Sequence, residues 1–487
     1  MRRELGQRLL TSTAAFAAVV LATAQSFVLD TAFRTNIESE YVNSILPLAD
    51  GTVIISGRMK FPGDMSFRSG ALLNLDGTRN LSFADVAYMG GKLTRWNDRV
   101  YAGNGPGMRR QFLNGTLDLS FDMVNAPYFS ALQGGDYLVY PDGRVLMSGA
   151  HTLSDTVRGF EGLYNLIWFS NQGYLDTTRT HRKGNGAVYA FKELGNGQFI
   201  CSGTCTQFDG HPCDKIFKVN ADGALDTIYH TGVNWGEADD YLPLEDGRIY
   251  FAGNFRRAVA PEDTLKLARF LADGSLDPSF ASPHFTLGVL PGGLYGMSLS
   301  RLHDRGQGRI IAMGNFQYVN GLPRRGICMI DSTGAVMDVF DDCGVGPYVY
   351  QNSTYGWLNG IMPDADSTHY YIWGAYNGYD DGTTNDLLQR FVTRLHGGDI
   401  STAAHTHAVP EAPMSVYPNP TSGACTVALE ALPRNATLVV RDALGREVQR
   451  NNVTDHYTTL TMAHSGVYSV EVWDARGRMA TERLVVE

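Results

Sequence analysis

Two short motifs alternate along most of this chain of 487 residues. The first is an apolar run closed by a glycine, as in DGRVLMSG, and the second ends in an aromatic residue, as in LADGSLDPSF at residues 271–280. A two-motif period of roughly 40 to 60 residues predicts an array of similar supersecondary units. The glycines that close the first motif are Gly57, Gly103, Gly149, Gly203, Gly253, Gly314 and Gly374.

Each unit contains the pattern of short antiparallel strands. In the first unit, VNSILPLAD and GTVIISGRM flank a turn at Asp50-Gly51, and SGALLNLDG and TRNLSF flank another at Asp76-Gly77. The residue before the motif glycine is usually small, which suits a place where backbones converge near an axis. Four strands in each of seven units predict an all-β, seven-bladed β-propeller over residues 25–396 rather than an open solenoid.

The first residues of this region predict how the ring closes. FVLDTAF at residues 27–33 copies the end of the second motif but has no first motif before it. The last unit runs through Gly374 to residues 387–398 and lacks that ending. We therefore expect the N-terminal segment to supply the outer strand of the last blade, which removes the open edges of a linear array.

The ending DGSLDPSF at residues 273–280 resembles the delta-60 repeat, with good copies at residues 222–229 and 114–121. This resemblance covers roughly residues 27–396 and implies a propeller of the kind found in exported bacterial proteins. It implies no shared catalytic residues.

The N-terminus has the pattern of a secretory signal peptide. Arg2, Arg3 and Arg8 precede an apolar stretch, and small residues stand at Ala22 and Ala24. This predicts a signal peptide over residues 1–24 with cleavage after Ala24. The alternative is a membrane anchor, but the apolar stretch is too short to cross a bilayer, so no transmembrane span is expected in the mature chain. The formal net charge of −10 argues against nucleic acid as a partner.

Residues 397–412 have few large apolar side chains and are expected to form a linker before a second domain. Short alternating strands over residues 413–487 predict a small Ig-like β-sandwich.

This last stretch contains, in order, Tyr417-Pro418-Asn419-Pro420 with Gly423, Leu444-Gly445-Arg446, Gly466-Val467-Tyr468 and Leu484-Val485-Val486. With these motifs it closely resembles the type A sorting domain of the type IX secretion system. The resemblance implies export across the outer membrane by that machinery, removal of the domain by a surface peptidase, and release or attachment at the cell surface.

The six cysteines of an exported chain permit disulfides. Cys205 and Cys213 bracket the turn-rich TQFDGHP and could face each other across a hairpin. Cys328 and Cys343 flank a second turn and are the other candidate pair.

Chemistry-bearing motifs are sparse. The sequence has no Gly-x-Ser-x-Gly elbow, His-Glu-x-x-His helix or Walker-type phosphate loop, so no catalytic residues, metal ligands or cofactors are predicted. Calcium at the acidic stretches 364–368 and 379–386 is the alternative, because calcium favours clustered oxygen ligands. Asp239-Asp240 and Asp341-Asp342 are expected in solvated turns between blades, because residues adjacent in sequence do not define a catalytic carboxylate pair.

These observations predict a secreted or cell-surface propeller that binds an extracellular glycan or protein. The alternative is an extracellular hydrolase or lyase acting on glycans or peptides at one mouth of the propeller, which the fold alone does not exclude. The evenness of the repeat favours binding. Aromatic side chains in the two longest units suit stacking on sugars or packing on a partner, although they could instead fill gaps between blades. They are Tyr295, Tyr348, Tyr350, Tyr355 and Trp357.

Overall fold

A computed structural model describes most of the chain, which divides into two compact units, Met1–Asp399 and Ile400–Glu487. The expected signal peptide at residues 1–24 and residues 398–412 of the expected linker lie outside the described residues. The described elements are β-strands and one 3-10 turn at Asp338–Phe340, which confirms the all-β class. The residues described are 27–84, 89–104, 107–122, 129–258, 264–287, 297–350, 353–365, 367–397, 414–429, 436–442, 446–474 and 477–487.

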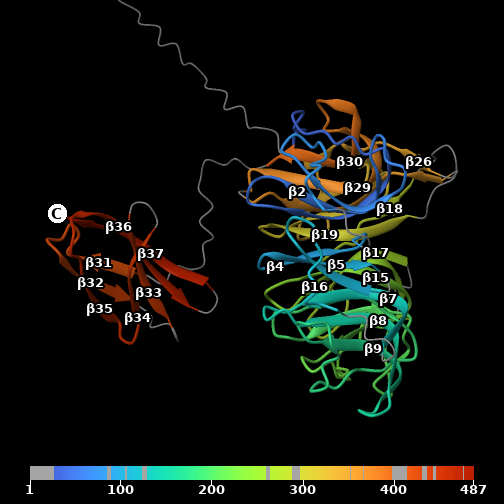
Figure 1. Ribbon diagram of the computed structural model, residues 1–487, viewed down its shortest axis with the longest axis horizontal. Helices are drawn as coiled ribbons and strands as arrows, with labels where there is room; N and C mark the ends of the chain where they lie inside the picture. The colour runs from blue at the N-terminus through green and yellow to red at the C-terminus, as the bar shows by residue number, and fades with distance from the viewer. Residues whose placement is uncertain are drawn as a thin grey trace, which may run out of the picture. The chain divides into compact units, whose positions relative to one another are not determined.

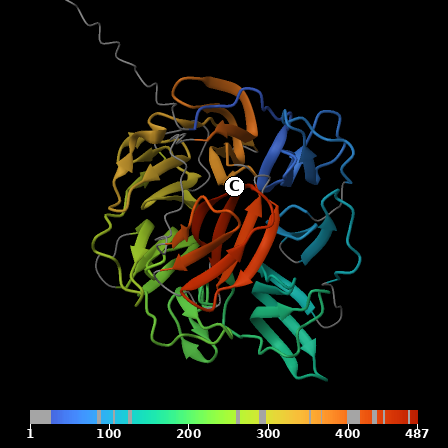
Figure 2. The same cartoon turned by 90° about the vertical axis from the view of Figure 1, so that its left-hand side faces the viewer.

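Within the first unit, three-stranded antiparallel meanders follow one another around a ring (Figure 2), which confirms the β-propeller. The described residues contain seven such meanders, and a single residue pair, Asn315 with Trp357, joins the sixth to the seventh. The first four are β1 (Ser39–Pro47), β2 (Val53–Lys60) and β3 (Arg68–Leu73); β4 (Leu93–Trp96), β5 (Arg99–Asn104) and β6 (Gly107–Phe112); β7 (Phe129–Val139), β8 (Val145–Asp155) and β9 (Phe160–Phe169); β10 (Val188–Glu193), β11 (Phe199–Gly203) and β14 (Ile216–Val219). The last three are β15 (Val233–Pro243), β16 (Ile249–Arg257) and β17 (Thr264–Phe270); β19 (Ser298–Gly306), β20 (Arg309–Asn315) and β23 (Ile327–Ile330); β28 (Trp357–Pro363), β29 (His369–Asp380) and β30 (Asn385–His396).

The ring also contains short strands. They pair with one another in small hairpins or add a short extra strand to a meander. They are β12 (Gln207–Phe208), β13 (His211–Pro212), β18 (Phe285–Thr286), β21 (Tyr318–Val319), β22 (Leu322–Pro323), β24 (Val336–Met337), β25 (Gly344–Val345), β26 (Tyr348–Tyr350) and β27 (Ser353–Tyr355).

In every meander except the second, the glycine that closes the first motif lies opposite a β-bulge in the first strand. A Cβ on Gly253 would lie 2.4 Å from the carbonyl oxygen of Glu237, where the pairing skips a residue between Ala238 and Asp240. Gly203, Gly314 and Gly374 meet a backbone carbonyl oxygen in the same way, at 2.0 to 2.1 Å. The motif therefore ends in glycine because the bulged strand approaches too closely for any side chain.

The predicted fourth strand is reduced to a single bridge in most units. After the fifth meander, Phe270 bridges Leu276, and the chain then turns again at Asp277. Oδ1 of Asp277 accepts hydrogen bonds from the Ser279 amide and hydroxyl at 2.9 and 2.7 Å. This second turn follows the Asp273 turn so closely that it ends the ladder. The prediction of four short strands in each unit was therefore wrong for most units, although the sixth has β24 as its fourth strand.

The aspartate of the second motif instead holds a buried arginine. Arg269 donates from Nε to Asp277 Oδ2 at 2.7 Å and from Nη1 to the Tyr250 hydroxyl at 2.9 Å. Its Nη1 also donates at 2.6 Å to the carbonyl oxygen of Ser332, which follows the third strand of the next meander. The second meander repeats this arrangement with Arg110 and Asp118. The motif thus links each such meander to its neighbour through a charge-assisted network.

The two ends of the propeller chain meet in the last meander, which confirms the predicted closure. Leu29 bridges Leu395, and the Asp30 amide donates to the Arg394 carbonyl oxygen at 3.0 Å. Arg394 Nε donates to Asp30 Oδ2 at 2.7 Å, and its guanidinium lies 4.9 Å from the centre of the Phe33 ring. Asp30 and Phe33 therefore act as Asp277 and Phe280 do elsewhere. Figure 1 shows the N-terminal part of the ring beside β29 and β30.

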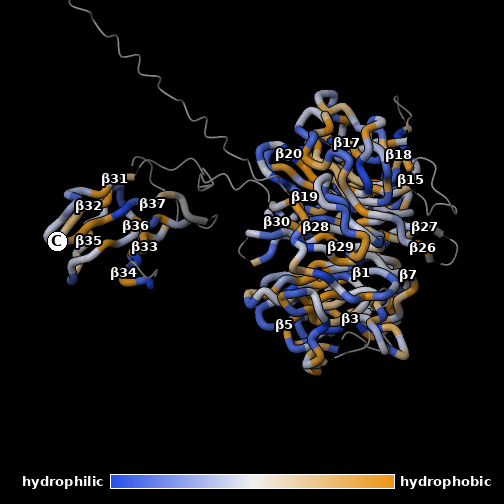
Figure 3. Tube along the Cα trace, turned by 90° about the horizontal axis from the view of Figure 1, so that it is seen from above, coloured by the Kyte–Doolittle hydropathy of each residue, from blue (hydrophilic) through white to orange (hydrophobic). Residues whose placement is uncertain are grey.

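Apolar side chains fill the spaces between neighbouring meanders, so the ring has several core clusters. Apolar and polar residues both occur along the chain of the ring (Figure 3). One cluster joins Ile45 and Ile55 of the first meander to Tyr371 and Val392 of the last. This packing between the first and last meanders adds to the backbone contacts that close the ring.

We expect the propeller to lose stability in acid because of the motif aspartates. Burial alone would raise the pKa of Asp118, but hydrogen bonds from Ser120 and Arg110 outweigh it and lower this pKa to about 2. Since the folded-state pKa lies below the ordinary value, the ionised carboxylate stabilises the fold above about pH 4, and this contribution of about 2 kcal/mol is lost as the pH falls towards 2. Denaturant unfolding of the mature chain at pH 6 and pH 2.5 measures the loss. Asp118→Asn should lower stability at pH 6 and lose less on acidification, whereas the exposed Asp338→Asn should match the wild type.

The second unit is a β-sandwich, as predicted. One sheet has the order β31-β32-β35 and the other β34-β33-β36-β37. Val427 and Leu460 of the first sheet pack against Val440 and Val472 of the second. The strands are β31 (Met414–Tyr417), β32 (Ala424–Leu429), β33 (Thr437–Asp442), β34 (Glu447–Asn452), β35 (Tyr457–Thr461), β36 (Gly466–Asp474) and β37 (Gly477–Val486). Among the residues described in both units, no helix is long and apolar enough to cross a membrane.

Candidate binding site in the axial channel

The first strand of every meander contributes to one cavity of about 760 Å³. The strands are β1, β4, β7, β10, β15, β19 and β28, which are the innermost strands of the ring. A cavity lined by all seven is the axial channel of the propeller. Its volume lies in the range of sites that hold small ligands, roughly 300–1,000 Å³.

The bulges opposite the motif glycines place side chains in this channel. Asp239 is skipped by the pairing between Ala238 and Asp240, and Tyr189 by the pairing between Val188 and Ala190. Both skipped residues line the cavity. Equivalent lining residues in the first and last meanders are Asn43 and Asn359, and the second and third meanders contribute Lys92 and Asp136. The repeat therefore produces a ring of polar side chains that line the channel.

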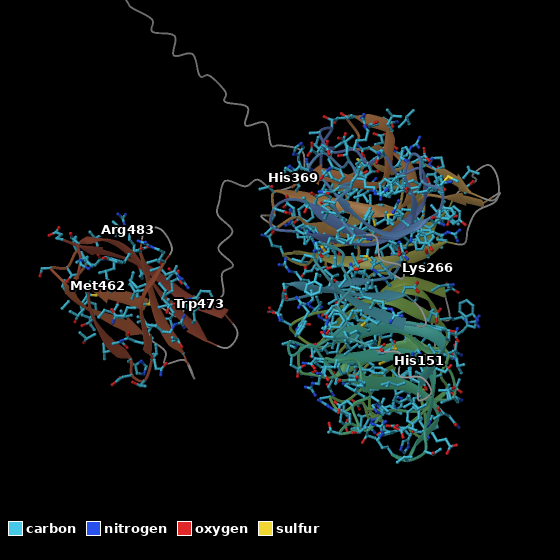
Figure 4. All side chains as sticks on the ribbon, in the orientation of Figure 1. His151, Lys266, His369, Met462, Trp473 and Arg483 are labelled. Carbon is cyan, nitrogen blue, oxygen red and sulfur yellow. The ribbon has the colours of Figure 1, made fainter. Side chains whose placement is uncertain are left out.

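Asp239 is the most perturbed carboxylate of this ring. Burial, followed by the nearby Glu237 carboxylate, raises the pKa of Asp239 to about 6, although Arg301 lowers it. Asp239 is exposed to the channel by surface area, yet the protein that surrounds it on all sides of the channel limits its solvation. Burial also raises the pKa of Glu237 and lowers that of Lys266, which is labelled in Figure 4. A perturbed carboxylate in a cavity marks a candidate functional site.

Two basic side chains of the channel, Lys92 and Arg301, are held by contacts within the protein. Lys92 Nζ lies 2.9 Å from both Asp136 Oδ1 and the Tyr137 carbonyl oxygen. Arg301 Nη1 donates to the Ser300 carbonyl oxygen at 2.8 Å and to that of Asp239 at 3.3 Å. These contacts fix donors and acceptors of both charges around the axis, as orientation-specific recognition requires.

Trp235 adds an exposed aromatic face to the strand that carries Asp239. It lies near the start of β15, is 47% exposed, and has the Arg256 guanidinium 5.7 Å from its ring centre. Because β15 leads directly from Trp235 to Glu237 and Asp239, an aromatic surface and two carboxylates occupy one end of one channel strand. Such rings suit stacking against sugars.

The aromatic residues predicted to bind ligand lie elsewhere. Tyr348 is 7% exposed and packs its ring 5.1 Å from Phe391. Tyr355 and Trp357 are half-buried against the same cluster, and Trp357 Nε1 donates to Ser300 Oγ at 3.2 Å. The described side chains thus fill gaps between meanders, which is the alternative stated above. Tyr295 and the side chain of Tyr350 lie outside the described residues, and ligand binding by this group stays a prediction.

The cysteines are unpaired in the structure. Between Cys205 and Cys213 the chain does form the expected hairpin, β12–β13, and the Cys213 amide donates to the Thr206 carbonyl oxygen at 3.1 Å. The Sγ of Cys328 approaches the Ala312 carbonyl oxygen, whereas that of Cys343 approaches the Asp341 carbonyl oxygen. The two candidate disulfides are therefore absent from the structure.

The acidic stretches mostly serve the fold. Asp381 accepts hydrogen bonds from the amides of Leu29, Thr383 and Thr384, and Asp386 pairs with Arg34. These carboxylates have partners within the protein, and calcium binding there stays a prediction. Asp341-Asp342 lies in a turn as expected, paired with Arg324 and Arg325. Asp239-Asp240 is a correction, because it lies within β15 in the channel and not in an inter-blade turn.

The bulge residues are the functional candidates that the sequence analysis missed. Asn43, Tyr189 and Asp239 each lie the same number of residues before their motif glycines, and Asn359 lies one residue further from Gly374. That nearly constant offset was the available signal. It becomes meaningful only when the bulge is known to aim this position at the axis.

In the sandwich, the two ends of the sorting motif are joined by hydrogen bonds. Asn419 Nδ2 donates to the Arg483 carbonyl oxygen, and Asn419 Oδ1 accepts from the Val485 amide at 2.9 Å. Thr421 pairs with Val486 in a parallel bridge. The Tyr468 hydroxyl donates to the His464 carbonyl oxygen at 3.0 Å, and the exposed Tyr417, Pro418 and Pro420 flank Asn419. Gly423 and Gly466 have positive φ, and Gly445 lies outside the described residues.

Comparison with family models identifies both units in part. Residues 415–487 match the model described as a secretion system C-terminal sorting domain. Residues 244–280 match the model described as a domain of unknown function that forms a beta-propeller. The protein thus carries a type IX sorting domain and is exported to the cell surface or secreted. No curated protein matches the chain.

Several solved structures are similar to the chain. PorZ, a bacterial surface component of the type IX secretion system of Porphyromonas gingivalis, has 14% identity and a TM-score of 0.34, over 92% of this chain and 66% of that one. The extracellular domain of a hybrid two-component system from B. thetaiotaomicron has 10% identity and a TM-score of 0.39, over 95% and 59%. An oligogalacturonate lyase from Vibrio parahaemolyticus has 12% identity and a TM-score of 0.41, over 76% and 96%. The chain thus spans less than two thirds of the length of the first two.

Proposed function

We propose that this exported seven-bladed propeller is a binding module that holds a glycan segment in its axial channel. The observation that carries the proposal is the ring of bulge residues, in which Asn43, Tyr189, Asp239 and Asn359 offer hydrogen-bonding groups around one cavity. A polar ring of both donors and acceptors suits a ligand rich in hydroxyl groups. Trp235 supplies a stacking surface beside it.

Export supports an extracellular ligand. We infer that the type IX machinery recognises the sandwich, and that a surface peptidase removes it within residues 397–412 before release or attachment of the propeller. The acidic formal charge of −10 is consistent with neutral or cationic ligands.

The binding experiment uses the mature chain, residues 25–487, on a glycan array, with calorimetry for any glycan retained. Tyr189→Phe removes only a channel hydroxyl and Trp235→Ala removes the aromatic face. Each should weaken binding about tenfold, because a lost hydrogen bond or stacking contact is worth about 1–1.5 kcal/mol. Matched controls are Tyr318→Phe and Tyr174→Ala, both exposed aromatics that do not line the cavity.

The controls should bind as the wild type does, and all four variants should melt at the wild-type temperature. Retention of peptides but of no glycan would replace the proposed ligand class. Equal affinity for Tyr189→Phe, Trp235→Ala and the wild type would place the ligand outside the channel.

A hydrolase or lyase is the second candidate, and the pKa of Asp239 near 6 is the observation that favours it. A carboxyl group with this pKa can exchange protons near neutral pH, as a general acid or base must. Asp240 and Arg301 line the same cavity. Release of new reducing ends from a bound polysaccharide, lost in Asp239→Asn, would establish this activity. Binding without any release would support the module alone.

A further inference from the structure

Three side chains with metal-binding atoms meet where the ring closes. One ligand atom from each of Asp30, His369 and His396 lies within 4.8 Å of the other two. Asp30 belongs to the closing segment, His369 begins β29 and His396 ends β30. The two histidines are directly paired across the β29–β30 ladder, with ring centres 5.1 Å apart. Figure 4 labels His369 at the left-hand margin of the propeller.

The histidine from β29 is oriented by a second carboxylate. His369 Nδ1 lies 3.1 Å from Asp364 Oδ2, and its backbone amide donates to Asp364 Oδ1 at 3.2 Å. This leaves Nε2, which lies 3.8 Å from Asp30 Oδ2. A carboxylate on the far ring nitrogen is the usual outer contact of a metal-binding histidine, because it fixes the ring and raises the basicity of the free nitrogen.

We propose that Asp30, His369 and His396 bind one divalent transition-metal ion, with Zn²⁺ the best fit. Two imidazoles and a carboxylate are a donor set that zinc accepts, whereas calcium prefers oxygen ligands alone. Bonds of about 2.0–2.2 Å in a tetrahedral site require donor atoms roughly 3.4 Å apart, so the three groups must contract by about an ångström. His396 is exposed, which lets it move and leaves the remaining position to water.

The charge around the site permits a dication. Arg394 Nε donates to Asp30 Oδ2 at 2.7 Å and opposes the ion. Asp30 and Asp364 together outweigh this single positive charge. The Asp30 carboxylate also stays in place without metal, since Arg394 and the Ala32 amide already hold it. The ion therefore adds to a preformed closure.

Bound metal would join three segments that close the ring. A ligand that binds only the folded state raises stability in proportion to the logarithm of its concentration. The expected role is therefore that of a structural metal site, which stabilises the closed propeller after export and is separate from the axial channel.

The test titrates Zn²⁺ into the chelator-treated mature chain and follows unfolding by calorimetry. The wild type should bind one ion, and its propeller transition should rise by about 2 °C or more at a large excess over Kd. His396→Gln and His369→Gln should abolish this shift, while Ca²⁺ should produce none. His284→Gln is the matched control for an exposed histidine outside the cluster.

Two further variants keep the outcome decisive. His405 and His407 lie within the expected linker and are an alternative pair of zinc ligands. The double variant His405→Gln/His407→Gln must therefore retain the zinc shift, because zinc bound only by those histidines would overturn the site. A wild type without a zinc shift, or an unchanged shift in His396→Gln, would also overturn it. Because His396 is exposed, His396→Gln should melt as the wild type does without metal. Trp235→Ala should keep the zinc shift, so failure of the glycan proposal leaves this one testable.

Discussion

Removal of residues 25–34 is expected to abolish cooperative folding of the propeller or to lower its Tm by more than about 10 °C. Phe27 is 2% exposed and Phe33 is fully buried, and truncation of one such side chain costs about 3–5 kcal/mol. Arg394 would also lose the Asp30 carboxylate, and because this pair is only partly buried the added cost lies below the roughly 3–5 kcal/mol of a fully buried pair. The sum is comparable with the whole stability of a typical domain, about 5–15 kcal/mol.

The measurement compares thermal unfolding of residues 35–487 with that of residues 25–487. A deletion of residues 401–410 removes the same number of residues from the expected linker and should leave the propeller transition unchanged. Asp30→Asn tests the ion pair alone and should fall between the two. An unchanged Tm for residues 35–487 would show that the N-terminal segment does not close the ring.

The closure was predictable because the N-terminal segment repeats a short sequence found at the end of the other units. LDTAF copies LDPSF, so Asp30 and Phe33 carry the pattern of Asp277 and Phe280 although they lie at the other end of the chain. The residue pattern does not show whether a full outer strand forms. Whether four residues after Leu276 continue a ladder or turn back depends on the Asp277–Ser279 hydrogen bonds and on Arg269 beneath them. These contacts are tertiary, and strand propensity does not report them.

The candidate site was harder to predict for a related reason. Asp239 and Asp240 follow Trp235 in a polar run that reads as a turn, yet they lie in an inner strand. Water in the axial channel allows such a strand to be polar on its inner side. Conversely, Tyr348 and Trp357 read as exposed aromatics of a long loop, but they pack between meanders. Sequence pattern gives the amphipathic period of a strand, whereas the choice between channel, inter-blade core and outer surface is made by closure of the ring.

Deletion of residues 413–487 is expected to remove the protein from the medium and the cell surface and to leave a folded propeller in the periplasm. The two compact units have separate hydrophobic cores, so loss of one leaves the packing of the other intact. Export by the type IX machinery requires the sorting domain that residues 415–487 match. In a bacterium that has this system, fractionation and immunoblotting of the full chain and the truncated chain measure the effect.

A point variant separates recognition from the mere presence of the domain. Asn419 is exposed, yet both atoms of its amide hold the last strand, through the Arg483 carbonyl oxygen and the Val485 amide. Asn419→Ala should therefore loosen the chain terminus and reduce secretion several-fold, whereas Asn451→Ala on the edge strand β34 should not. The sandwich core, led by Leu438 and Leu484, should keep both variants folded. Truncated protein in the medium at the level of the full chain would contradict the role of the domain, and full secretion of Asn419→Ala would show that the joined motif is not what the machinery reads.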